Sequence, residues 1–451
     1  LNGKEAIGHA RNLCDNSYGE HIMRDFEYNL AKCGITPEYD YQANTYRNGT
    51  YNTYIEKALK NRKEIFDIFN EHKLPYTPEL EQKREVYFPV EVYCHNCRRD
   101  HTTVTAFNEK EKSINYVCAD CGNKGLYTIG KDFCGKLMWK VNWSARWHDS
   151  NVAFESSGEN QLTETGSYAV SSRIVKEIFG GSVPFSLLYR FIGVPGAAKL
   201  SRALKERALA TRFTDVLEPA LIRWLLLKNA PNKPFSVDIE ENIARLYHEW
   251  DVFCQKATGT DATQTERRIY EIAVKGVKQD SLKIPFGKLV MALTYSKDVN
   301  GALALLQKAG AVKTHNTAEE LGECIKIRLE CARCWLFKYG HKMQSLNLQF
   351  NGAFYNSLDR QNRQLIDSFA EKVENLGSED EISALLYDLP KTFATNTAEA
   401  QKLTKDFFSN LYMLLFGTTK GPKLATLFSL LPPETGKTLL GTQAKHGENY
   451  E

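Results

Sequence analysis

Four cysteines in two close pairs carry the sharpest chemical signal in the sequence. Cys94 and Cys97 form one C-x2-C pair, Cys118 and Cys121 form another, and twenty residues separate the pairs. Each pair can offer two thiolates from one tight turn, and this spacing is typical of ribbon-type zinc sites. Because four thiolates fill a tetrahedral coordination sphere, we expect a structural zinc ion rather than a catalytic one. The alternative is four unligated cysteines in a β-rich insert.

Three further cysteines, Cys324, Cys331 and Cys334, have a spacing that places them on one face of a helix. Their segment is an ordinary amphipathic helix in which cysteine serves as a small apolar residue, and no fourth ligand follows at a suitable distance. We therefore expect them to pack in the core.

The elements that must position these residues change character along the chain. Apolar residues at helical spacing predict a helix over 53–73, with a capping box formed by Thr53 and Glu56. Short β-branched and aromatic stretches over 86–143 predict a small β-rich insert around the cysteines. The segment 172–191 is typical of a helix followed by a buried strand, as in an α/β core.

Beyond residue 215 the pattern is almost entirely helical. The two clearest apolar stripes are Ile239, Ile243, Leu246, Trp250 and Phe253, and then Leu403, Phe407, Leu411 and Leu414 before Gly417. The acidic cluster at 378–381 is interpreted as a solvated loop or the start of a helix.

Composition narrows the class of protein. The chain has 451 residues, of which 42% are hydrophobic, 25% charged and 11% aromatic, as in a soluble folded protein of about three domains. No apolar run is long enough to span a bilayer, and a net charge of +3 does not by itself indicate a nucleic-acid partner. The sparse cysteines and the lack of a signal peptide favour a cytoplasmic location.

Longer motifs connect these observations to a known family. The runs are GKLMWKVNWSARW at 135–147, VAFESSGENQLTETGSY at 152–168 and FSLLYRFIGVPGAAKLSRA at 185–203. In order and spacing they resemble the catalytic domain of class I (archaeal-type) lysyl-tRNA synthetases. The resemblance extends to both sides, for example to FFSNLYMLLFGTTKGPKLATLFSLL near the C-terminus, and so covers nearly the whole chain.

The resemblance implies an incomplete α/β Rossmann-type class I aminoacyl-tRNA synthetase catalytic core with a small zinc-binding β insert, followed by an all-α C-terminal domain. We expect the remainder of the first Rossmann half with connecting helices at 1–85 and the zinc-ribbon-like insert at 86–134. The second Rossmann half with a KMSKS-like loop follows at 135–215, and an α-helical region that binds the tRNA and its anticodon at 216–451.

The phosphate-binding motifs of the family are eroded in this sequence. The HIGH-like segment is not found, and because the chain begins at Leu1 we expect an N-terminal truncation. The KMSKS-like loop keeps Lys199 and Ser201, which the resemblance implies to be catalytic.

The family contacts ATP and lysine with a glycine, a lysine, an aspartate and a histidine, where this chain has Gly158, Glu159, Asn160 and Gln161. Only the glycine matches, and Glu159 brings negative charge towards the nucleotide. The resemblance implies a substrate and ATP site formed by Trp143, Trp147, Gly158, Asn160, Gln161, Ser167 and Tyr168. Simple core packing is an equally good explanation of the aromatic residues.

A basic strip between residues 194 and 233 has a local net charge of +5 and can neutralise RNA phosphates. We expect Lys205, Arg207 and Arg212 to bind RNA, although a solvated helix face would look the same.

Two functions remain open. The first is a lysine–tRNA ligase that uses lysine, ATP with Mg²⁺ and a lysine-type tRNA. The second is a catalytically degenerate protein, derived from a synthetase, that still binds tRNA or other RNA. A zinc-ribbon scaffold unrelated to tRNA is a weaker third interpretation, and whether the chain is an enzyme stays open at this point.

Overall fold

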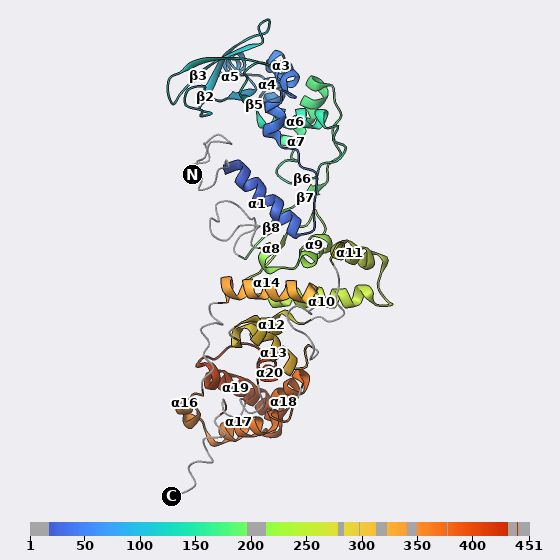
Figure 1. Cartoon of the computed structure of the whole chain (residues 1–451), viewed down its shortest axis with the longest axis vertical. Coiled ribbons are helices and arrows are strands. Elements are labelled where there is room, and N and C mark those ends of the chain that lie inside the picture. The colour runs from blue at the N-terminus through green and yellow to red at the C-terminus, as the bar shows by residue number, and fades with distance from the viewer. Residues whose placement is uncertain are drawn as a thin grey trace. The chain divides into compact units, whose positions relative to one another are not determined.

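The computed structural model describes residues 18–195, 213–277, 284–296, 298–312, 323–340, 350–376, 378–431 and 440. The chain divides into two compact units, whose elements are labelled in Figure 1. Unit 1 comprises Leu1–Ala208 and Asn229–Val237, and unit 2 comprises Leu209–Lys228 and Asp238–Glu451. This division is coarser than the four expected segments, which stay predictions.

Unit 1 begins with helices. They are α1 (Tyr18–Lys32), α2 (Gln42–Arg47), α3 (Asn52–Lys60), α4 (Arg62–Asn70), the 3₁₀ helix η1 (Glu71–Lys73) and α5 (Pro78–Glu85). The helical structure expected over 53–73 is confirmed, but the segment forms separate helices rather than a single one. The side chain of Asn61, between α3 and α4, donates to the carbonyl oxygen of Lys57 at 2.8 Å. The backbone of Asn61 has a φ of −99° and a ψ of 26°, which differ from helical values, so one helix ends there and the next begins.

The expected capping box at Thr53 is also wrong. The N-cap residue of α3 is Tyr51, which makes no capping hydrogen bond with its side chain. The amide of Ile55 already donates to the Tyr51 carbonyl at 2.9 Å, so Thr53 lies inside the helix. Glu56 instead pairs with Lys112 of the β-rich insert at 2.8 Å.

The β-rich segment expected over 86–143 contains five strands, although its last residues, from Trp139 on, belong to a helix. Its strands are β1 (Val90–Val92), β2 (Thr102–Asn108), β3 (Ser113–Cys118), β4 (Lys124–Thr128) and β5 (Gly135–Leu137). β2, β3 and β4 form an antiparallel meander, and β1 pairs with β5, also antiparallel. The chain thus leaves the insert beside the strand by which it entered.

A part of unit 1 with parallel strands follows the insert. Its elements are α6 (Trp139–Asp149), β6 (Ser157–Gly158), α7 (Ser167–Ile174), the π-helical turn η2 (Val175–Phe179), β7 (Leu188–Tyr189), β8 (Ile192–Gly193) and β9 (Phe235–Ser236). β6 pairs with β7 and β8 with β9, both in parallel. Parallel strands need a crossover connection, which α7 and η2 supply between β6 and β7. The burial expected of the strand within 172–191 is wrong, because Tyr189 is 42% exposed and Phe185, just before β7, is 69% exposed.

The described part of unit 2 contains helices and no strand, as expected from its apolar stripes. The helices are α8 (Phe213–Val216), α9 (Pro219–Lys228), α10 (Ile243–Thr258), α11 (Gln264–Val274), α12 (Phe286–Tyr295), α13 (Val299–Lys308), α14 (Glu323–Tyr339), α16 (Gly352–Ser357), α17 (Arg360–Val373), α18 (Glu379–Thr392), α19 (Thr397–Phe416) and α20 (Leu424–Leu430). The stripe of α19 is buried, and Gly417 ends that helix with a φ of 66°.

A buried ion cluster holds several of these helices together. Arg328 of α14 pairs with Glu218, which immediately precedes α9, and binds both oxygens of Asp251 of α10 at 2.8 Å. It also donates to the carbonyl oxygen of Ile284, ahead of α12, at 3.0 Å. One guanidinium group therefore ties four segments of unit 2 together.

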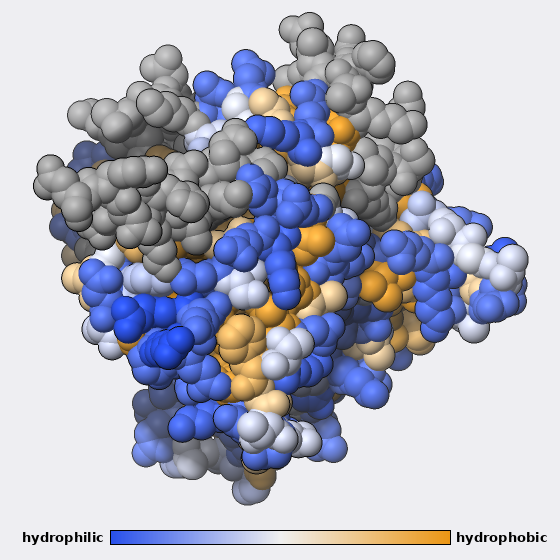
Figure 2. Space-filling model, turned by 90° about the horizontal axis from the view of Figure 1, so that it is seen from below, coloured by the Kyte–Doolittle hydropathy of each residue, from blue (hydrophilic) through white to orange (hydrophobic). Residues whose placement is uncertain are grey.

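The surface seen in Figure 2 is mostly hydrophilic, with its apolar residues in separate patches. Within the described ranges, no helix combines the length and apolarity that a bilayer span requires.

Candidate functional site

The four cysteines of the two C-x2-C pairs converge in unit 1. Their sulfur atoms all lie within 4.8 Å of one another. The Sγ atoms of Cys94 and Cys121 are 3.6 Å apart, and those of Cys97 and Cys118 are 3.5 Å apart. The cluster can hold a metal ion with four sulfur ligands, which leaves no coordination position for a substrate.

Two turns with the same backbone hydrogen bonds present these sulfurs. The amide of Arg98 donates to the Cys94 carbonyl at 2.9 Å, and the amide of Gly122 donates to the Cys118 carbonyl at 3.0 Å. Arg98 and Gly122 have φ angles of 62° and 69°, the left-handed conformation that closes each turn. The matching geometry explains why each C-x2-C pair aims both sulfurs at one point.

The electrostatics of the cluster favour a thiolate at Cys94. Burial opposes its ionisation, but the backbone amides of Cys97 and Asn96 and the adjacent thiols outweigh burial and lower the pKa of Cys94 to about 6. Asn123 supports the same sulfur, with its Nδ2 3.7 Å from Cys94 Sγ. A thiolate is the form that binds metal.

A second constellation surrounds the carboxylate of Glu155. The indole nitrogen of Trp143 lies 3.1 Å from both carboxylate oxygens, and that of Trp147 lies 2.6 Å from Oε2. Tyr168 packs on Trp147 with ring centroids 5.4 Å apart and donates its hydroxyl hydrogen to the Pro184 carbonyl at 2.6 Å. Trp143 and Trp147 are almost fully buried, so their own role in the described state is packing.

Sequence reasoning missed two members of this constellation, Trp139 and Glu155. Trp139 is half-exposed and stacks on Trp143, with centroids 5.1 Å apart and an interplanar angle of 17°. The signal was available, because Trp139, Trp143 and Trp147 recur every four residues and so share one helix face. Trp139 is thus the member of the stack with an indole surface open to a ligand.

The turn after β6 brings together the other expected substrate residues. The Gly158 amide donates to the side-chain oxygen of Gln161 at 3.2 Å, and the Tyr168 amide donates to the Gln161 carbonyl at 2.9 Å. Asn160 is exposed, and Ser167 begins α7. These residues therefore lie at the carboxyl end of a parallel strand and the start of the next helix, the usual ligand position in open α/β sheets.

The negative charge of Glu159 is not isolated. Its Oε2 lies 2.6 Å from Nη1 of Arg190, which follows β7. The sequence indicated a negative charge at this edge, and the structure adds its partner, because Arg190 directly follows the neighbouring strand.

Comparison with known proteins identifies the family of this chain. A family model described as tRNA synthetases class I (K) matches residues 9–276, more than half of the chain. The chain belongs to this family. Membership rules out the zinc-ribbon scaffold unrelated to tRNA.

Curated relatives of this class I synthetase extend the match beyond residue 276, over most of unit 2. The lysine–tRNA ligase of Streptomyces coelicolor is 27% identical over 466 residues, which span 94% of this chain and 80% of that protein. The lysine–tRNA ligase of Pyrococcus horikoshii is 28% identical over 432 residues, 93% of this chain and 79% of that protein. Among solved structures, a glutamate tRNA ligase from Elizabethkingia meningosepticum matches 93% of this chain and 88% of its own at 13% identity, with a TM-score of 0.33.

Several residues expected to serve the synthetase reaction lie outside the described residues. They are Lys199 and Ser201 of the KMSKS-like loop, and Lys205, Arg207 and Arg212 of the basic strip. Their roles stay predictions.

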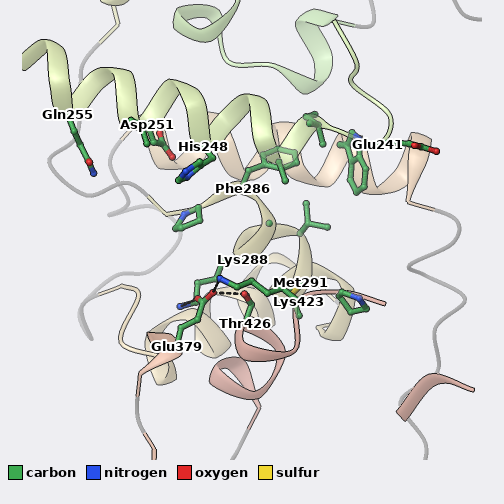
Figure 3. A pocket seen from close by; sticks show the side chains of 18 residues that line it. Glu241, His248, Asp251, Gln255, Phe286, Lys288, Met291, Glu379, Lys423 and Thr426 are labelled. Atoms are coloured by element: carbon green, nitrogen blue, oxygen red, sulfur yellow. Dashed lines mark hydrogen bonds and ion pairs between the residues drawn. The ribbon is translucent and has the colours of Figure 1, made fainter. Parts of the chain in front are cut away.

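The helical unit of this synthetase contains a separate pocket of about 620 Å³ (Figure 3). His248, Asp251 and Gln255 of α10 line one side, and apolar side chains such as Phe286 and Met291 line much of the rest. On the other side, the carboxylate of Glu379 accepts hydrogen bonds from Thr426 at 2.6 Å and Lys423 at 3.0 Å, and pairs with Lys288 at 3.1 Å. Sequence reasoning interpreted Glu379 only as part of a solvated or helix-starting acidic cluster.

Proposed function

We propose that this chain is a lysine–tRNA ligase. It joins lysine to ATP, with Mg²⁺, as lysyl-adenylate and then transfers lysine to the terminal ribose of a lysine-type tRNA in the cytoplasm. The observation that carries the proposal is the family match, together with lysine–tRNA ligases that align over more than nine-tenths of the chain.

We place the substrates at the carboxyl ends of β6 and β7, in a Rossmann-type catalytic domain. Gly158 and the turn to Gln161 approach the nucleotide, with Asn160 and Ser167 beside it. The packed pair Trp143 and Trp147, with Tyr168, supports the exposed face of Trp139 as the wall of the lysine site. Lys199 and Ser201 of the KMSKS-like loop stabilise the charge that develops when pyrophosphate leaves.

We assign zinc to the cluster of Cys94, Cys97, Cys118 and Cys121. With Zn–S bonds of about 2.3 Å, tetrahedral sulfur ligands lie about 3.8 Å apart. The two close sulfur pairs, at 3.6 and 3.5 Å, fit that spacing. The metal stabilises the insert, and catalysis is left to the parallel part of unit 1.

We assign tRNA binding to the helical unit and to the basic strip with Lys205, Arg207 and Arg212. Scattered cations on a family member that acts on RNA fit phosphate contacts, whose affinity falls with salt.

The direct test is lysine-dependent exchange of pyrophosphate into ATP, followed by aminoacylation of a lysine-tRNA transcript. Lysine should support exchange and glutamate should not. Lys199→Ala should slow exchange about 100-fold, because one preorganised cation is lost, whereas Lys176→Ala, an exposed lysine of η2, should not.

The second candidate is a degenerate synthetase that binds tRNA without activating lysine. It is favoured by the motif departures, since Gln161 uses its side-chain oxygen internally on the Gly158 amide and only Lys199 and Ser201 remain of the KMSKS-like loop. Salt-sensitive tRNA binding without any lysine-dependent exchange would select this candidate.

A further inference from the structure

An ion pair joins the ends of β6 and β7. Gly158 pairs with Tyr189 in the parallel register, so Glu159 and Arg190 are the next residues along neighbouring strands. Their backbones are anchored, because the Glu159 amide donates to the Tyr189 carbonyl at 3.2 Å and the Arg190 amide donates to the Pro231 carbonyl at 2.9 Å. Both side chains therefore start from fixed positions at the edge where parallel sheets bind ligands.

Alternation along the strands puts the pair on the same face of this sheet as Glu155. Glu155, Ser157 and Glu159 share one face of their strand, whereas Phe154 projects from the other. The stacking of Phe154 on Phe185, with centroids 6.0 Å apart, confirms that the apolar side chains meet across the strands on the opposite face. On the face shared by Glu155 and Glu159, the carboxylate of Glu155 accepts from the indoles of Trp143 and Trp147 and lies 3.7 Å from Arg146, whereas Glu159 and Arg190 pair with each other at the strand ends.

We propose that Arg190 binds the phosphates of ATP at this edge, and that Glu159 is its partner while the nucleotide is absent. The inference rests on the proposed function, since it takes ATP as the substrate, and it adds a binding residue that no motif assigns. The resemblance places a lysine at position 159, where this chain has glutamate. Arg190 is the cation that this chain places beside that glutamate.

The chemistry of the pair allows this exchange of partners. The Arg190 side chain is 43% exposed and that of Glu159 is 31% exposed, so solvent and ligand can reach both. An exposed ion pair contributes little to stability, and its separation is therefore easy. A guanidinium group offers several donors in a fork that fits phosphate oxygens, and a triphosphate carries more negative charge than one carboxylate.

The test is direct ATP binding by isothermal titration calorimetry, with Mg²⁺ and without lysine or tRNA. Arg190→Gln should raise the Kd for ATP roughly tenfold and leave the Kd for adenosine unchanged, because only the phosphates lose a partner. Glu159→Gln should lower the Kd for ATP several-fold, since it releases the guanidinium. Arg190→Lys should fall between the wild type and Arg190→Gln. The matched control is Arg173→Gln on α7, which breaks the exposed ion pairs of Arg173 with Glu71 of η1 and Glu177 of η2.

The inference is overturned if Arg190→Gln changes the Kd for ATP less than twofold, or weakens adenosine and ATP equally. An unchanged or raised Kd for ATP in Glu159→Gln would show that the Glu159 carboxylate does not compete with the ATP phosphates for Arg190. Normal lysine activation together with an unaffected Arg190→Gln would reject the inference and keep the ligase function. Arg190-dependent ATP binding without lysine activation would keep the inference and reject the ligase function. A wild-type protein with no saturable ATP binding would overturn the inference itself.

Discussion

Of the side chains in the described part of unit 2, Arg328 is the one whose replacement we expect to destabilise the unit most. It is 4% exposed and its guanidinium binds Glu218, Asp251 and the Ile284 carbonyl. Arg328→Met would remove the cation that the buried Glu218 and the partly buried Asp251 share, so we expect the free energy of unfolding of unit 2 to fall by about 3 to 5 kcal/mol. Urea denaturation followed by the helical circular dichroism signal measures this.

The matched control for this change is Arg333→Met on the same helix. Arg333 pairs with Glu330 at 2.6 Å, but both side chains are more than half exposed. Its loss should cost less than about 1 kcal/mol. Equal effects of the two substitutions would show that the buried cluster is not what holds these helices.

At the scale of the secondary-structure elements, Glu379 connects the ends of three helices. It is the first residue of α18 and binds Lys288 of α12, Thr426 of α20 and Lys423 before α20. Burial raises the pKa of this carboxyl, but its hydrogen bonds outweigh burial and the net shift is downward. A carboxyl group whose pKa is lowered by folding stabilises the protein above its unfolded pKa and loses that contribution as the pH falls through the folded value.

We therefore expect Glu379→Gln to lower the free energy of unfolding by about 1 to 2 kcal/mol at pH 7, after allowance for partial exposure. The difference from the wild type should shrink as the pH falls below about 4.5, where carboxyl groups become protonated in the unfolded chain. Denaturation curves at several pH values measure it. Asp380→Asn, at the exposed neighbouring position, should have no comparable effect; a pH-independent difference would contradict the carboxylate as the cause.

The β-rich insert is the element that we expect to depend on metal. Cys97→Ser should abolish stoichiometric zinc, because a closed four-thiolate site loses affinity when one ligand is removed. Amide hydrogen exchange should rise across 90–128 and stay unchanged in unit 2. Cys134→Ser, an exposed cysteine of the same segment outside the cluster, is the control. Full zinc content in Cys97→Ser, by elemental analysis, would refute the assignment.

Local patterns predicted some elements and missed others for physical reasons. The stripe of Leu403, Phe407 and Leu411 predicted α19, because a single periodic face determines such a helix. The break at Asn61 was missed, because the apolar residues continue at helical spacing on both sides of it while the backbone of Asn61 leaves the helical conformation.

The same limit applies to the sites. The spacing of the cysteines puts two thiols on each of two tight turns, and this local pattern was enough to predict the cluster. The partners of Glu159 and Glu379 are Arg190 and Lys288, far away in the sequence, and they become visible only when the chain is folded.

At the scale of the whole molecule, the two units should respond to different substrates. ATP with lysine should reduce hydrogen exchange in the turn 158–168 of unit 1, whereas a lysine-tRNA transcript should also reduce it among the helices of unit 2. Protection by tRNA should weaken as salt is raised from 50 to 200 mM, since counterions compete for phosphate contacts. Hydrogen exchange with mass spectrometry measures both, and tRNA protection confined to unit 1 would contradict RNA binding by the helices.

The two C-x2-C pairs lie close together in the sequence, and this has a consequence for folding during synthesis. All four sulfur ligands lie between residues 94 and 121, and the β2–β3 hairpin spans the interval between the pairs. Closing so short a loop costs little chain entropy, and hairpins form within microseconds. The four cysteines can therefore come together, and take up the zinc ion proposed for them, while the helical unit is still being translated on the ribosome and before β6 and β7, which follow the insert, pair.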